Sequence, residues 1–279
     1  MLHIMWLNRN VTKERVDAAQ LGEALARFLA TDEVGLKKWI KQRFIERFYG
    51  RRPHPFVLAL QHPSRAVLLG YVLEHQHFLR QWVKSLSWIV IKAERVDVMT
   101  MELDNIATEF LGYRGGKPAH YELLIRMGES TGLDRQTILG TAPLPGTSAS
   151  LATWREIAEQ RHWLEIMAAM HSLELIASRN LVDEGACMRY FDPAIFQSGE
   201  VTEATKAFLR EGYEADVGHS EIPLELVEKE APGLGLVEDV QTTFLRSIDA
   251  FDRYLMARLE RAAQFDPKVL TYVRQGIAG

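Results

Sequence analysis

Pairs of acidic and histidine side chains in this sequence have spacings that could bind metal ions. Glu109 and His120 flank a glycine-rich break, so Glu109 would end one helix and His120 would start the next. His171 and Glu174 are three residues apart, which places them on one face of a helix. In helical bundles, inward-facing side chains of this kind hold two oxygen-activating metal ions, because carboxylates bridge the ions and imidazoles fix the geometry. The pairs therefore indicate a metal site.

These residues also have interpretations without a metal. Glu109 could be a solvated residue at a helix end and His120 a helix-start residue. Glu174 lies among Met, Ala, Leu and Ile, where an unpaired carboxylate is costly, so it is either a ligand or part of a surface salt bridge. A third pair, Asp216 and His219, has the same three-residue spacing. Alone, that pair is as typical of a surface hydrogen bond as of a site.

Other reactive residues are less informative. His75 and His77 point about 200° apart on one helix, so they cannot both face one ion. One of Glu74 and His77 is expected to line a pocket, with the other exposed. Cys187 is the only cysteine, which excludes intramolecular disulfides and thiolate metal clusters and favours a cytoplasmic location.

The composition excludes several classes of protein. The chain has 279 residues, of which 47% are hydrophobic and 25% charged, so neither a disordered chain nor a fibre is expected. The net charge is −4 and the basic residues are scattered, which argues against nucleic acid as a partner. Apolar runs fall far short of the ~20 residues that cross a bilayer, and residues 1–10 lack the pattern of a secretory signal. We therefore expect no membrane partner and no secretion.

Long stretches without Pro or Gly, separated by short breaks, predict an all-α protein. The expected long helices cover 14–29, 34–48, 65–93, 94–111, 120–131, about 150–178, 202–230, 237–263 and 267–275. No alternating strand pattern of useful length appears. The prediction is a single helical bundle of eight to ten helices, one domain over 1–279, in which helices of residues 1–50 pack on a core of residues 54–263.

Three blocks of this sequence resemble one superfamily. His54-Pro55-Phe56, Gly70-Tyr71 and His77-Phe78 are similar to its "HP-aromatic … G … Q/H-x-aromatic" opening. The segments 108–112, 120–124 and 128–133 resemble an "E-x-x-G … H-x-x-L … G-L" block, and 215–219 resembles a "D-x-x-H" segment. Over residues 54–227 the chain thus resembles the superfamily of heme-oxygenase-like diiron oxidases, the pyrroloquinoline quinone synthesis protein C and thiaminase II.

The resemblance implies a bundle of the heme-oxygenase-like type and a set of iron ligands. The positions that match the ligands of the diiron members are Glu109, His120, Glu174, Asp216 and His219. A sixth ligand, a histidine four residues before Asp216, is replaced here by Gly212. Either His171 takes its place, or water or substrate fills the position, or the site keeps one metal ion.

The activity that the resemblance implies is oxidation of a small, amino-acid-derived substrate with O2 as co-substrate and one or two ferrous ions as cofactor. We expect Tyr213 and Glu74 to act as catalytic groups, with Tyr121 also near the pocket. A homodimer and an external electron donor are the further expected partners.

Other functions stay open. A metal-independent oxidase of the quinone-synthesis type, or a binding protein with a degenerate metal site, would use the same cavity with His219 as acid or base. A non-catalytic interaction protein would satisfy these polar groups internally. Thiaminase activity would need a catalytic cysteine on a core helix, and Cys187 lies outside every matched segment.

Overall fold

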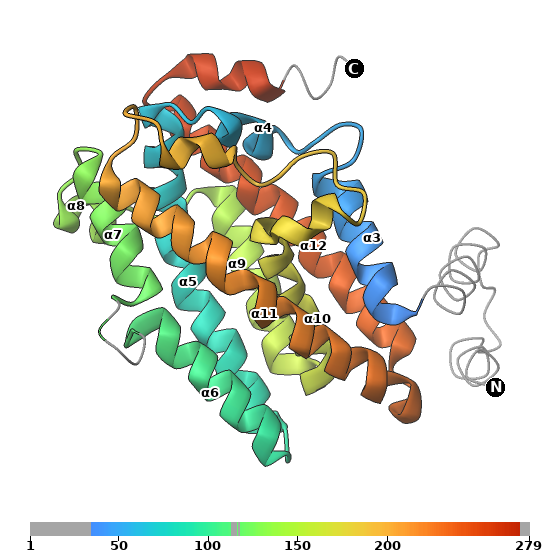
Figure 1. Ribbon diagram of the computed structural model, residues 1–279. Coiled ribbons are helices and arrows are strands. Elements are labelled where there is room, and N and C mark those ends of the chain that lie inside the picture. The colour runs from blue at the N-terminus through green and yellow to red at the C-terminus, as the bar shows by residue number, and fades with distance from the viewer. Residues whose placement is uncertain (1–34, 113–115, 117, 274–279) are drawn as a thin grey trace.

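The computed structural model describes residues 35–112, 116 and 118–273, and only the backbone of residues 214–220. The helix expected over 14–29 lies outside the described residues. In the described part, all regular structure is helical and no strand is present, which confirms the all-α prediction (Figure 1). The α-helices are α3 (Leu36–Phe48), α4 (Pro55–Gln61), α5 (Arg65–Lys92), α6 (Val96–Phe110), α7 (His120–Ser130), α8 (Arg135–Gly140), α9 (Pro145–Gln160), α10 (Trp163–His171), α11 (Glu203–Leu234) and α12 (Val237–Ala263).

Helix α5 lies at the centre of the bundle. The Ser64 hydroxyl caps its first turn by accepting a hydrogen bond from the backbone N–H of Val67. Its side chains pack against α6, α7, α9, α10 and α12, and most of them are buried. Because a helix surrounded on all sides can bury polar groups as well as apolar ones, α5 is well placed to contribute to an internal site.

One expected helix is divided in two. Instead of one helix over about 150–178, α9 begins earlier, at Pro145, and ends at Gln160, and α10 follows. His162 causes the break: its Nδ1 accepts a hydrogen bond from the N–H of Leu164, while the carboxylate of Glu165 accepts one from the N–H of His162. After His171 the chain tightens into the 3-10 helix η1 (Ser172–Ala177), which carries Glu174. The single long helix was therefore a wrong prediction, because a histidine acts as the cap.

Short 3-10 helices complete the labelled elements: η2 (Arg179–Val182), η3 (Pro193–Phe196) and η4 (Pro267–Leu270). Residues 271–273 continue η4 as α-helix, in the range where a helix over 267–275 was expected, and residues 274–275 lie outside the described residues. The buried apolar residues of the described helices form one continuous hydrophobic cluster. No described helix is both long and apolar enough to span a lipid bilayer.

Gly70 allows α5 and α12 to approach closely. A Cβ atom at this position would overlap the backbone oxygen of Arg258 and would lie 2.7 Å from the backbone nitrogen of Ala262. Because backbone atoms cannot move aside as a flexible side chain can, we expect Gly70→Ala to lower the free energy of unfolding by about 3 kcal/mol, although alanine is the better helix former. Gly140→Ala, in α8 with no atom within 4 Å of the added carbon, is the matched control and should be neutral or slightly stabilising. Urea unfolding of both variants measures the difference, and equal stabilities would contradict this account of the helix contact.

Candidate active site

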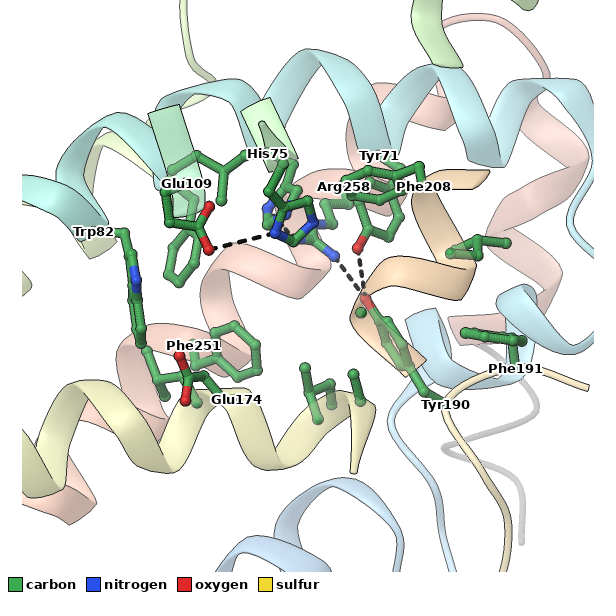
Figure 2. A pocket seen from close by; sticks show the side chains of 18 residues that line it. Tyr71, His75, Trp82, Glu109, Glu174, Tyr190, Phe191, Phe208, Phe251 and Arg258 are labelled. Carbon is green, nitrogen blue, oxygen red and sulfur yellow. Dashed lines mark hydrogen bonds and ion pairs between the residues drawn. The ribbon is translucent and has the colours of Figure 1, made fainter. Parts of the chain in front are cut away.

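An internal cavity lies between α5, α6, α7, η1, α11 and α12. The volume open to the centre of a water molecule is about 80 Å³, which is room for a few waters or a small organic molecule. Aromatic side chains form much of its wall (Figure 2). The ionisable and hydroxyl groups on the wall are Tyr71, His75, Glu109, His120, Glu174, Tyr190 and Arg258. An apolar cavity with a few convergent polar groups is typical of a ligand site.

One end of the cavity is acidic. Glu109, from the last turn of α6, and His120, the first residue of α7, meet across the glycine-rich break, with 3.4 Å between His120 Nδ1 and Glu109 Oε1. Oε2 of Glu109 is buried and has no hydrogen-bond partner among the described residues. Burial acts to lower the pKa of His120, but the carboxylates of Glu109, Glu211 and Glu174 raise it above its ordinary value. This end therefore attracts cations.

Glu174 is held in place by a buried histidine. His171 Nδ1 lies 3.4 Å from Glu174 Oε2, and His171 Nε2 lies 2.9 Å from Oε1 of Glu102 on α6. Burial opposes a charge on this imidazole, but the two carboxylates raise the pKa of His171 to about 10. Both ring nitrogens of His171 are thus engaged, and the protonated ring orients Glu174.

The other end of the cavity is cationic (Figure 2). Arg258 on α12 donates from Nη1 to the hydroxyl of Tyr190 (2.8 Å) and from Nη2 to Nδ1 of His75 (2.7 Å) and to the Tyr254 hydroxyl. Tyr190 in turn donates to the hydroxyl of Tyr71 at 3.4 Å. Burial and the charge of Arg258 hold the pKa of His75 well below its ordinary value, so the ring is neutral and can accept this hydrogen bond.

The TENA/THI-4/PQQC family matches residues 39–262 of this sequence, which include every element of the cavity. The chain belongs to this family. Its fold is heme-oxygenase-like, as expected from the sequence: the chain is similar to a domain of unknown function with a heme oxygenase-like fold from Shewanella denitrificans OS217, with a TM-score of 0.57 and 16% identity over 90% of this chain and 96% of that one.

Two further solved structures are similar to this family member. A TenA family transcription regulator from Silicibacter sp. TM1040 has a TM-score of 0.56 and 15% identity, and the match covers 75% of this chain and 88% of that one. A CADD-like protein of unknown function from Nostoc punctiforme PCC 73102 has a TM-score of 0.56 and 18% identity, covering 82% and 96%. At these identities the likeness concerns the fold. No curated protein sequence matches the chain.

In this member of the TENA/THI-4/PQQC family, the expected metal ligands fall into two groups. Glu109, His120 and Glu174 line the cavity, and so does Gly212, the position where a histidine was expected. Asp216 and His219 follow Gly212 on the backbone of α11, but their side chains lie outside the described residues. Among the described residues, no three His, Cys, Asp or Glu side chains are grouped to hold a metal ion.

His171 is not on the cavity wall, and both of its ring nitrogens contact carboxylates, those of Glu174 and Glu102. No described side chain therefore takes the place of the histidine that was expected at position 212. A full set of ligands in this family member would require groups from α11 in addition to Glu109, His120 and Glu174.

The residues expected to be catalytic lie outside the cavity. Glu74 is fully buried and paired with Arg261, with 2.7 Å between Oε1 and Nε. His77 is half-buried and contacts the backbone oxygen of Thr141, so neither Glu74 nor His77 lines the pocket and neither is exposed, contrary to the prediction. The cavity-lining histidine of α5 is His75, one residue after Glu74.

The two expected tyrosines are also absent from the wall. Tyr213 packs against Phe191 and Phe196, with ring centroids 5.6 and 6.1 Å away. Tyr121 stacks on Phe110, with 4.8 Å between ring centroids. Tyr213 therefore supports the outer face of the wall through Phe191, which does line the cavity.

Proposed function

We propose that this chain is an iron-dependent oxidoreductase that uses O2 to oxidise a small molecule inside the cavity. The observation that carries the proposal is the buried Oε2 of Glu109, which has no partner in the part of the chain that the structure describes, on a cavity that Glu174 and His120 also line. A buried carboxylate oxygen without a donor is costly, and a cation would remove that cost. Asp216 and His219, on α11 after the cavity-lining Gly212, would complete the ligands.

The donor types fit iron. Carboxylate oxygens and imidazole nitrogens bind ferrous ions, and no thiolate among the described cavity residues would favour a softer metal. When bound, ferrous iron supplies the redox chemistry that reduces O2. The part played by this chain is to hold the carboxylates of Glu109 and Glu174 in place and to offset the charge of the cation.

The surrounding residues prepare the site for this role. His171 and Glu102 fix the orientation of Glu174, as groups behind a metal ligand commonly do. Phe78, Trp82 and Phe208 on the wall limit access of water to the oxidised group. Because Gly212 contributes no donor, we expect one iron to bind tightly and a second to bind weakly.

Iron loading tests the proposal. Titration of the metal-free protein with ferrous iron under anaerobic conditions should give about one tightly bound equivalent, and admission of air should then cause O2 uptake above that of the same iron without protein. Iron that is lost on desalting, together with no extra O2 uptake, would contradict the proposal. O2 consumption that survives a strong iron chelator would instead support the metal-independent oxidase.

A further inference from the structure

Arg258 is an unusual buried cation. Its side chain is 2% exposed, and the guanidinium lies over the rings of Tyr71 and Tyr254, with 4.1 and 4.4 Å from Cζ to the ring centroids. Arginine stays protonated at every physiological pH, so a full positive charge lies beside the cavity. Aromatic faces and phenol oxygens stabilise this charge in part.

No carboxylate of the described residues forms an ion pair with Arg258, whose hydrogen-bond partners are phenols and a neutral imidazole. Other cations that are largely buried here do have carboxylate partners. Lys41, 6% exposed, lies 2.7 Å from Glu184, and Arg261 lies 2.7 Å from Glu74. Because burying a charge without a counterion is expensive, the exception at Arg258 requires a reason.

The donors of Arg258 are not all used. Its Nε is buried and has no hydrogen-bond partner among the side chains and backbone that the structure describes. The hydroxyl of Tyr71 accepts from Tyr190 and has no described acceptor for its own hydrogen. Arg258 and Tyr71 both line the cavity, so an anion bound there could accept hydrogen bonds from a guanidinium and from a hydroxyl group.

The imidazole ring of His75 lies between the cationic end and the acidic end of the cavity. His75 accepts from Arg258 on one side, and its ring centroid lies 6.3 Å from that of His120 on the other. A molecule bound at Arg258 would therefore need only a short chain of a few bonds, or a single ring, to reach Glu109 and His120. The aromatic wall between the two ends favours an apolar body.

We propose that Arg258 and Tyr71 bind the carboxylate of a small organic acid, whose apolar body extends toward Glu109, His120 and Glu174. As a statement about the substrate, this inference rests on the proposed oxidase function. The negative charge of the acid supplies the missing counterion, and the fixed position of its carboxylate decides which atom lies near the acidic end. The small volume of the cavity limits the acid to a short chain or a single ring.

The test compares an acid with its neutral isostere on iron-free protein. The probes are 3-phenylpropanoate and 3-phenylpropanamide, and calorimetry measures their affinities. We expect wild type to bind the acid at least about tenfold more tightly than the amide, since hydrogen bonds between charged groups are stronger than those to a neutral amide. Equal affinities for acid and amide would overturn the proposal, and this comparison needs no variant.

Variants then locate the preference. In Arg258→Met the affinities for acid and amide should become about equal, and in Arg258→Lys, which keeps the charge without the planar fork, the preference should shrink. Arg253→Met, at an exposed position on the same helix, is the control and should keep the preference of wild type. An acid preference that is unchanged in both Arg258 variants would overturn the assignment.

The same data separate this inference from the proposed function. A protein that binds the acid through Arg258 but takes up no iron would contradict the oxidase proposal while supporting the carboxylate site. A protein that takes up iron and consumes O2 but treats acid and amide alike would contradict the carboxylate site alone.

Discussion

Glu109→Gln is expected to weaken the binding of ferrous iron at least about a hundredfold and to abolish iron-dependent O2 uptake. Loss of a group that only orients a ligand commonly costs 10–100-fold in metal affinity, and loss of a charged ligand costs more. Glutamine has the size of glutamate and can still accept a hydrogen bond from Nδ1 of His120, which lies 3.4 Å from Oε1. The change therefore removes the charge and leaves the shape. Anaerobic iron titration followed by oxygen-electrode measurement gives both quantities.

The stability of the metal-free variant distinguishes a ligand from a structural ion pair. Glutamine keeps an acceptor for Nδ1 of His120, and the imidazole can lose its proton once the carboxylate is gone, so the free energy of unfolding of the metal-free protein should change little. Glu122→Gln, which removes a half-buried carboxylate on α7 that pairs with Arg135 of α8, is the control and should keep the iron affinity of wild type. A Glu109→Gln protein that is less stable but still binds iron as wild type does would assign Glu109 a structural role only.

The sequence predicts helices well where their ends carry common signals. Ser64 and Thr202 cap α5 and α11, which begin within one residue of the predicted starts, and α12 covers the predicted residues. The break between α9 and α10 is missed because its cap is His162, a residue type that rarely plays this role. The error is local, but it matters for the site, since the tight turn that follows α10 carries Glu174.

The acidic end of the cavity is predictable for a simple reason. Glu109 and His120 belong to consecutive helices joined by a short break, so the chain itself keeps them close. The partners behind them are not predictable in this way. Glu102 reaches His171 across 69 positions of sequence, and nothing in the local pattern around either residue points to the other.

The cationic end escapes sequence analysis because its members look ordinary. Tyr254 and Arg258 are four residues apart on an amphipathic helix, a spacing that is common on solvated faces. Only the packing of α12 against α5 at Gly70 makes the position of Arg258 internal. The helical spacing of His75 and His77 excludes a shared ion but does not indicate that His75 accepts a hydrogen bond from Arg258.

The two ends together explain why the cavity can be both buried and charged. Glu109 and Glu174 favour a cation at one end, and Arg258 favours an anion at the other, with the neutral ring of His75 between Arg258 and His120. A metal ion and an organic acid bound together would each neutralise the end that they contact. Each should therefore bind more tightly in the presence of the other.

Gly212→His is expected to strengthen the binding of a second equivalent of iron at least about tenfold. Gly212 lies on the cavity wall with Glu109, His120 and Glu174, and it precedes Asp216 by four residues on α11. An imidazole at this position adds a neutral nitrogen donor on the helix face that the proposed ligands of α11 share. Since a metal site gains affinity with each well-placed ligand, the weak second position should become tight. The anaerobic titration should then show two bound ions in place of one.

The control for this change is Gly212→Leu. Leucine fills a similar volume and gives a similar gain in helix propensity, but it has no atom that binds a metal. Any tightening that both variants share would come from the rigidity of α11 or from exclusion of water, and a second tight equivalent in the histidine variant alone would come from the imidazole. If histidine and leucine give the same single equivalent, then Gly212 does not adjoin an iron position, and the acidic end of the cavity accommodates one ion at most.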